Sequence, residues 1–424
     1  MRGVVYASGL GSTDVRTLII LLIFLSAMPD TMAAPVVKEL FMDRYGASPS
    51  MAQLFNGINL FGAFAALPLL WFVRGKNHSV ALVIWGSLAD AFLLAVMALP
   101  LGLEWTLVVR ALEGVTDVIV FAALFDLVRR SSRGHVGAGM GIASSPLLMG
   151  LGFGAMLGGL VVRQSAEGVS ANWLFGLSAV LSIFVAGIAF IARRRIETFQ
   201  PSSLVEIAND DADIESQSQV RDPMWPSLAM TFSDRATGGL ITGTLPIALS
   251  QVFGYSPLVR GLLVGLPLLL MALGTGPAGW LCDRVGSLRV RIFAGVAYAA
   301  SFALLSVAGD RAVPLGIVMV IIGLSASALF SSSISLVIRS GPATMALGAF
   351  RGVGDLGFLS GTAFSVLLLS SLGGESPTYF NYAAVLTIFA GFHALTTLIT
   401  GVTLKISRNR NTVASKSLNT PQGQ

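Results

Sequence analysis

The chain contains twelve apolar stretches, each close to the roughly 20 residues that a helix needs to cross a hydrocarbon layer. Continuous apolar runs of this length predict helices, because a membrane-spanning barrel would show short segments of alternating polarity. The predicted spans are 17–37, 51–73, 80–100, 105–128, 136–162 and 171–192, followed by 224–250, 257–281, 290–308, 313–338, 344–371 and 378–404. We therefore expect an all-α integral membrane protein with twelve transmembrane helices.

The composition supports this class and excludes others. Hydrophobic residues make up 54% of the sequence and charged residues only 12%, about half the charged fraction of an average soluble domain. The sequence contains no glycine-rich phosphate-binding loop, so we do not expect ATP hydrolysis to drive transport. No nucleophile–base set and no metal-ligand cluster stands out either. We expect no enzyme, no cofactor and no metal site.

The two halves of the chain look like copies of one unit. Short motifs recur in the same order, 207 to 209 residues apart. Tyr45-Gly46-Ala47-Ser48-Pro49 returns as Phe253-Gly254-Tyr255-Ser256-Pro257, Pro68 and Trp71 return as Pro277 and Trp280, and Gly141, Gly150 and Gly154 return as Gly348, Gly357 and Gly361. Internal repeats of this kind are typical of secondary transporters, which place the substrate where the repeats meet.

The repeat predicts the domain organisation. Residues 1–195 and 224–405 are expected to form two six-helix bundles related by a pseudo-twofold axis. The stretch 196–223 between them is acidic and polar, which is typical of a cytoplasmic linker. Residues 406–424 form a polar cytoplasmic tail.

The distribution of Lys and Arg predicts the orientation. With the N-terminus inside, nineteen of the 27 basic residues fall in cytoplasmic segments and five in outward loops. This agrees with the positive-inside rule and places both termini in the cytoplasm of a protein of the cell (inner) membrane. The excess of basic residues thus reflects the membrane topology and does not indicate nucleic-acid binding. We expect a monomer whose partners are the lipid bilayer, a small solute and protons.

One motif carries a family resemblance. Gly279-Trp280-Leu281-Cys282-Asp283-Arg284-Val285-Gly286 resembles the signature that the major facilitator superfamily carries between helices eight and nine. The resemblance covers essentially the whole chain and implies a transporter that works by alternating access. It also implies that Gly279, Asp283, Arg284 and Gly286 form a cytoplasmic gate motif, with the aspartate at the positive end of a neighbouring helix. In the first half, Arg74 stands where the aspartate is expected.

Three further segments are similar to family patterns. Arg110 to Gly114 in span four is similar to the family's Arg-x-x-x-Gly pattern. The run from Gly141 to Gly150, through Pro146, resembles the glycine–proline motif of proton-linked antiporters. Asp30 is similar to the first-helix aspartate of the drug–proton members.

Ionisable side chains inside the spans are costly in lipid and are therefore candidates for function. The candidates for the substrate and proton pathway are Asp30, Arg110, Glu113, Asp117, Asp234, Arg235, Arg351 and Asp355. Arg110, Glu113 and Asp117 are spaced to share one face of helix four, and Arg351 and Asp355 are spaced to pair. By the resemblance, most of these lie near a central cavity.

The functional role of these charges has alternatives. Asp90, also within a span, is expected to be structural. Asp234 and Arg235 are adjacent and point apart, so Arg235 is expected to pair across helices. Arg110 with Glu113 is either a static pair that orders helix four or part of a proton site.

We expect a secondary transporter that exports a small organic solute in exchange for protons. In this reading Glu113, Asp117 or Asp234 loses and regains a proton as the cavity alternates. One alternative is a proton symporter that imports a small organic anion, bound by Arg110, Arg235 and Arg351. Another is a receptor or assembly subunit that has a transporter fold and moves nothing.

Overall fold

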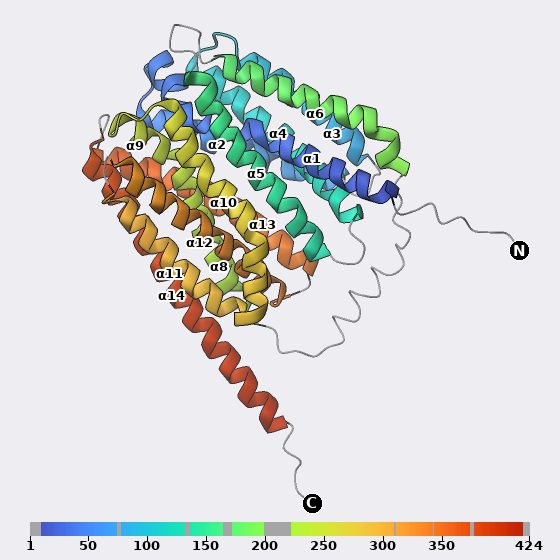
Figure 1. Ribbon diagram of the computed structural model, residues 1–424, viewed down its shortest axis with the longest axis vertical. Coiled ribbons are helices and arrows are strands. Elements are labelled where there is room, and N and C mark those ends of the chain that lie inside the picture. Colours follow the sequence, from blue (N-terminus) through green and yellow to red (C-terminus); the bar gives the residue numbers. More distant parts are fainter. Residues whose placement is uncertain are drawn as a thin grey trace, which may run out of the picture. The chain divides into compact units, whose positions relative to one another are not determined.

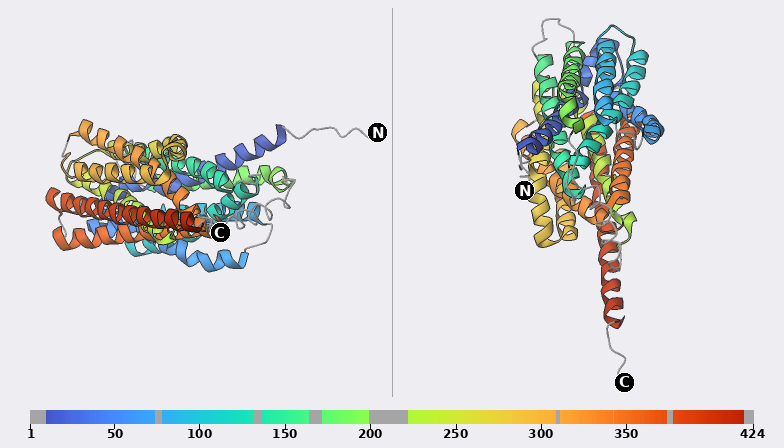
Figure 2. Two further views of the ribbon diagram at one scale, coloured as in Figure 1. Left: turned by 90° about the horizontal axis from the view of Figure 1, so that it is seen from below. Right: turned by 90° about the vertical axis from the view of Figure 1, so that its right-hand side faces the viewer.

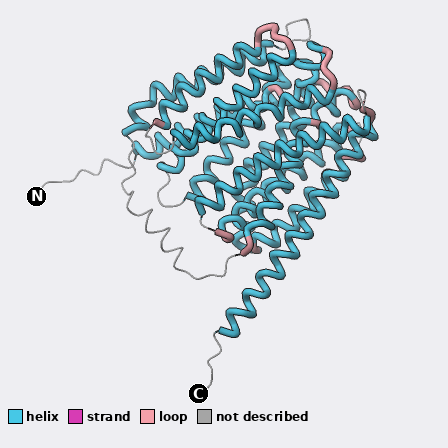
Figure 3. The backbone as a smooth tube through the Cα atoms, turned by 180° about the vertical axis from the view of Figure 1, so that it is seen from behind, coloured by secondary structure: helices cyan, strands magenta, loops and turns pink. Residues whose placement is uncertain are grey.

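The structure is a computed structural model and describes residues 10–73, 78–131, 136–163, 172–198, 222–308, 311–341, 343–373 and 377–418. Within these ranges it contains helices and connecting turns and no strand (Figure 3). Most of the predicted linker (199–221), the first-half segment around Arg74 (74–77) and the end of the tail (419–424) lie outside the described residues.

The helices follow the predicted spans closely (Figure 1). The first half comprises α1 (Leu10–Met32), η1 (Ala34–Val36), η2 (Lys38–Asp43), α2 (Pro49–Val73), α3 (Ser79–Met97), α4 (Leu103–Ser131), α5 (Val136–Arg163) and α6 (Asn172–Thr198). The second half comprises α8 (Met224–Gly243), α9 (Leu245–Gln251), α10 (Pro257–Val285), α11 (Ser287–Leu305), α12 (Ala312–Ile338), α13 (Ala343–Gly373) and α14 (Tyr379–Leu418).

The seventh predicted span, 224–250, is broken into two helices. α8 ends at Gly243 and α9 begins at Leu245, with Pro246 in the first turn of α9. Proline has no N–H to donate, and its ring collides with the carbonyl group four residues earlier. A single helix through this segment is therefore disfavoured, which the apolar pattern alone did not reveal.

Nine of the described helices are long and apolar enough to cross a membrane. The criterion does not select α2, α4 or α8. In α4, Arg110, Glu113 and Asp117 fall within two turns, and α8 carries Asp234 and Arg235. Both α4 and α8 thus carry adjacent or closely spaced charges within a span.

The described helices pack into two compact units. The first contains α1 to α6 together with Thr242–Ala272, which holds α9 and the first part of α10. The second contains the earlier part of α8, the remainder of α10 and α11 to α14. This division differs from the sequence repeat, because Thr242–Ala272 belongs to the second copy.

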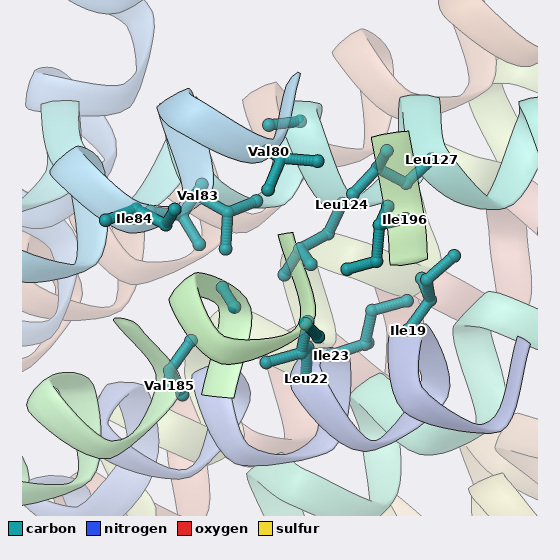
Figure 4. Packing of buried hydrophobic residues seen from close by; sticks show 14 of the residues in the cluster. Ile19, Leu22, Ile23, Val80, Val83, Ile84, Leu124, Leu127, Val185 and Ile196 are labelled. Carbon is teal, nitrogen blue, oxygen red and sulfur yellow. The ribbon is translucent and has the colours of Figure 1, made fainter. Parts of the chain in front are cut away.

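The core of the first unit lies between α1, α3, α4 and α6 (Figure 4). Aliphatic side chains from all four helices meet there, and most of them are fully shielded from solvent. The labelled members are Ile19, Leu22, Ile23, Val80, Val83, Ile84, Leu124, Leu127, Val185 and Ile196. The dense packing fixes α1, α3 and α6 around the charged face of α4.

In the second unit, α11 packs along both α12 and α14. Smaller buried clusters join α8 to α12, α13 and α14, including Met230 with Leu336 and Leu404, and Val337 with Ala346 and Phe350. α14 is the longest helix and continues well past the end of α11 (Figure 2).

Glycines bring matching helices of the two repeats into close contact. In the first repeat, a Cβ at Gly150 or Gly154 of α5 would overlap a backbone carbonyl of α1. In the second repeat, Gly357 and Gly361 of α13 meet carbonyls of α8 in the same way. The two repeats therefore use the same pair of helices for close packing at glycine.

The repeated turn before α2 and α10 has the same backbone in both copies. Gly46 has φ +64° and Gly254 has φ +65°, a left-handed conformation that favours glycine. The following residue, Ala47 or Tyr255, donates its N–H to a carbonyl six residues back. The next helix then begins at Pro49 or Pro257, where a missing N–H costs nothing.

Candidate functional site

The first unit gathers a buried group of charges around α4. Arg110 forms an ion pair and hydrogen bond with Glu113, and the two are 4% and 0% exposed. The Arg110 guanidinium also lies 4.9 Å from the ring centroid of Phe55 on α2. One nitrogen of Arg110 reaches the backbone carbonyl of Asp30 at 3.4 Å. The predicted shared face of helix four is thus confirmed as a contact surface.

Two more carboxyl groups complete this group. Carboxylate oxygens of Asp30, Glu113 and Asp117 all lie within 4.8 Å of one another. The amide nitrogen of Asn59 on α2 donates to Glu113 at 2.7 Å and to Asp117 at 3.1 Å. We call Asp30, Asn59, Arg110, Glu113 and Asp117 the α4 charge cluster. It holds three acids and one base.

The approach of α2 to α4 depends on a small residue. A Cβ at Gly114 would overlap the backbone carbonyl oxygen of Asn59. With glycine there, the two helices approach closely enough for Asn59 to reach both Glu113 and Asp117. In the structure, Asn59 is the residue that bridges these two carboxyl groups.

The second unit holds a different charged group around Asp234 of α8. Arg291 of α11 donates to Asp234 at 2.7 Å, and the Arg291 side chain is fully buried. Ser333 of α12 donates to the other carboxylate oxygen at 3.4 Å. His393 of α14 places its Nδ1 atom 3.8 Å from Asp234 and 3.1 Å from the hydroxyl of Ser233.

Arg291 is a residue that sequence reasoning missed. It was counted among the cytoplasmic basic residues, although it is the second residue of the predicted span 290–308. The structure starts α11 at Ser287, directly after Gly286, so Arg291 lies inside the helix and against α8. The left-handed glycine before the helix was the sequence signal for this earlier start.

The expectation for Arg235 was wrong. It was predicted to pair across helices, but among the described residues it forms no ion pair within 4.0 Å, and its neighbour Asp234 pairs with Arg291 instead. The Arg235 side chain packs beside Gly354 of α13. The predicted pair on α13 is confirmed, with Arg351 donating to Asp355 at 2.8 Å. Arg351 is half exposed, so this pair is more open than the α4 charge cluster.

Arg260 is another charge that the sequence misplaced. It was counted among the outward basic residues, although it falls inside the predicted span 257–281; it lies in the first turn of α10 and is 1% exposed. It forms an ion pair with Glu39 of η2, within the first unit. Two of its guanidinium nitrogens have no hydrogen-bond partner. This pair joins residues from the two sequence repeats.

The gate motif is arranged differently from the loop that the resemblance implied. Gly279, Asp283 and Arg284 belong to the last turns of α10, and only Gly286, with φ +97°, forms the turn. Arg284 stacks on the ring of Trp280 at 4.0 Å. Asp283 is exposed and forms no hydrogen bond or ion pair with a described residue.

The α4 charge cluster also contains the only described set of acids that could hold a metal ion. Arg110 already places a positive charge against Glu113 in this set. A metal ion at the same point would repel the guanidinium, so the donor set fits a smaller positive charge better.

Comparison with known proteins identifies the family. The Major Facilitator Superfamily model matches residues 19–232 and 224–417, which together span nearly the whole chain. No curated protein matches the sequence.

Solved transporter structures share the fold. A structure of the peptide transporter POT in complex with alafosfalin has a TM-score of 0.71 at 14% identity, covering 96% of each chain. The nucleoside transporter NupG gives 0.64 at 16% identity, covering 92% of this chain and 99% of that one. A bacterial homologue of the human lysosomal transporter Spinster gives 0.62 at 15% identity, covering 97% and 98%. The chain is thus a multi-pass membrane protein that belongs to the major facilitator superfamily.

Proposed function

We propose that the protein is a secondary transporter that exports a small organic solute in exchange for protons, by alternating access. The observation that carries this proposal is the α4 charge cluster, in which three carboxyl groups surround one guanidinium. A buried excess of negative charge in an apolar surrounding is costly unless a cation or a proton compensates it. Taking up this proton on one side of the membrane and releasing it on the other would couple solute export to the proton gradient.

The comparison between the two charged groups supports protons as the coupling ion. Asp234 has Arg291 as a buried partner of opposite charge. In the α4 charge cluster, Arg110 pairs with Glu113, and Asp30 and Asp117 have no cation of their own among the described residues. The uncompensated acids are therefore in the first unit, and we place the proton site there rather than at Asp234.

The test is transport by the purified protein in liposomes with an imposed pH gradient. Glu113→Gln, Asp117→Asn and Asp30→Asn are each expected to reduce the response of flux to the gradient by tenfold or more, on the order of 1.4 kcal/mol or greater in coupling. Asp126→Asn is the matched control, because Asp126 lies on the same helix but is partly exposed and pairs with Arg130. Full response in all three cluster variants would disprove the proposal.

A second candidate is uptake of a small organic anion by proton symport. Arg235 has no ion-pair partner among the described residues, and Arg351 is half exposed, so both are available to a carboxylate. An inside-alkaline gradient separates the two functions, because it drives uptake of label in a symporter and loss of accumulated compound in an antiporter. Arg235→Gln is expected to abolish anion uptake only in the symporter.

A receptor or assembly role is the third candidate. A protein of this kind would bind a ligand, found by a thermal-stability screen against metabolites and drugs, and show no flux in liposomes. We further propose that the protein is a monomer of the cell (inner) membrane with both termini in the cytoplasm. Labelling of single cysteines placed near each terminus, in a Cys282→Ser background, tests that orientation.

A further inference from the structure

Asp90 of α3 is a buried acid that the proposed proton site does not use. It is 6% exposed, and no cation pairs with it among the described residues. Ser182 of α6 donates to one of its oxygens at 2.6 Å, and Thr116 of α4 lies 3.3 Å from the other. The sequence suggested a structural role, but two hydroxyl contacts compensate a carboxylate poorly.

Thr116 connects Asp90 to the α4 charge cluster and suits both protonation states. Its hydroxyl oxygen lies 2.7 Å from the carbonyl oxygen of Glu113 and 3.3 Å from Asp90, so its single proton can be donated to the nearer Glu113 carbonyl. A protonated Asp90 can therefore donate to the Thr116 oxygen without disturbing that bond. An ionised Asp90 can instead receive the bond from Ser182.

A small cavity, lined by both polar and apolar side chains, separates Asp90 from Asp117. It is lined by Ser26, Ser87, Asp90, Asp117, Val120, Ser182 and Val185, and the volume open to the centre of a water molecule is about 10 Å³. That is room for about one water, which needs two to four polar partners. The hydroxyl oxygen of Ser26 is buried and has no hydrogen-bond partner in the protein. A water in the cavity would provide that partner.

The second repeat fills the corresponding space. Ser26, Asp90 and Val185 each have a counterpart 208 residues later, which are Asp234, Tyr298 and His393. The rings of Tyr298 and His393 pack together there, with centroids 4.9 Å apart. The cavity thus lies in the first repeat, in the same unit as the α4 charge cluster.

We propose that a water molecule held in this cavity joins Asp117 to Asp90, and that Asp90 is a second proton-accepting group of the coupling site. This inference rests on the proposed proton coupling. The proton on Asp117 passes to the water oxygen as one of the water's own protons passes to Asp90. The products are an Asp117 carboxylate, an intact water and a protonated Asp90, so no charge is created.

Several charged groups face Asp90 from one of the helices packed against α3. They are Arg110, Glu113 and Asp117, all from α4. On α6, the titratable groups lie only in the last turns, from Arg193 to Glu197. Asp117 is the acid across the cavity, and the two carboxyl groups line it together.

Infrared difference spectroscopy of the purified protein in lipid tests this without any substrate. Spectra recorded between two pH values report carboxyl C=O bands, and exchange into H₂¹⁸O reports a buried water. Asp90→Asn is expected to remove one carboxyl band and to change the pH at which the Asp117 band disappears. Ser26→Ala is expected to weaken or remove the water band.

A matched pair on α6 keeps the test independent of folding defects. Ser182→Ala removes a hydroxyl from the cavity and is expected to change the water band, whereas Ser178→Ala, one turn away and buried against Met32, is expected to leave it unchanged. An Asp117 band that titrates identically with and without Asp90, or no water band in the native protein, overturns the inference. Flux measurements judge the proposed function separately, because these spectra need no transport.

Discussion

Arg291 on α11 and Asp234 on α8 form a buried ion pair at 2.7 Å in the second unit. Asp234 also accepts a hydrogen bond from the hydroxyl of Ser333, whereas two of the guanidinium nitrogens of Arg291 have no hydrogen-bond partner. Such a pair depends on both members, because removing one leaves an uncompensated charge in an apolar surrounding.

We therefore expect Arg291→Met to destabilise the protein by about 3–5 kcal/mol, measured as a fall in thermal unfolding temperature in detergent. The double variant Arg291→Met with Asp234→Asn is expected to recover most of this loss, because no charge is then left unpaired. A single variant as stable as the native protein would contradict this account.

Arg260 and Glu39 join the first turn of α10 to η2 within the first unit. Arg260→Met is expected to loosen this end of the packing, since Glu39 then loses its only ion pair among the described residues. Hydrogen exchange should become faster in residues 38–43 and 257–264, with no change in α14. Unchanged exchange in both segments would show that the pair contributes no local stability.

Gly361 and Gly352 of α13 form a matched pair of sites. A Cβ at Gly361 would overlap the backbone of Ala236 on α8, whereas Gly352 has nothing within 4 Å. Gly352→Ala is expected to stabilise the helix by up to about 1 kcal/mol. Gly361→Ala is expected to lower the unfolding temperature despite the same gain in helix propensity. Equal effects of the two substitutions would mean that α8 and α13 do not pack this closely.

The turns at Gly46 and Gly254 provide a test of the repeat. Alanine at either position is strained by the positive φ and should cost about 1–2 kcal/mol in the free energy of unfolding. Asparagine, which tolerates this region better, should cost less. Gly276→Ala, inside α10 with open space around it, is the control and should not destabilise. Different costs at Gly46 and Gly254 would indicate that the two copies of the turn have diverged.

The sequence determined the helices and the repeat. Long apolar runs in lipid can satisfy their backbone groups only within helices, so nearly every predicted span became one helix. Backbone conformation is a local property, which is why the repeated glycines Gly46 and Gly254 adopt the same left-handed turn in both copies. The charges on one face of helix four also followed from spacing alone.

Tertiary structure decided which charges meet. Asp234 selects Arg291 and not its neighbour Arg235, because the crossing of α8 and α11 places the former within reach. Arg260 is buried because η2 supplies Glu39, and Asp90 faces Asp117 across a cavity that the second repeat fills with rings. Spacing along one helix fixes the direction of a side chain, but the depth and angle at which helices pack fix its partner. That information depends on all contacting side chains together, and no single segment of the sequence contains it.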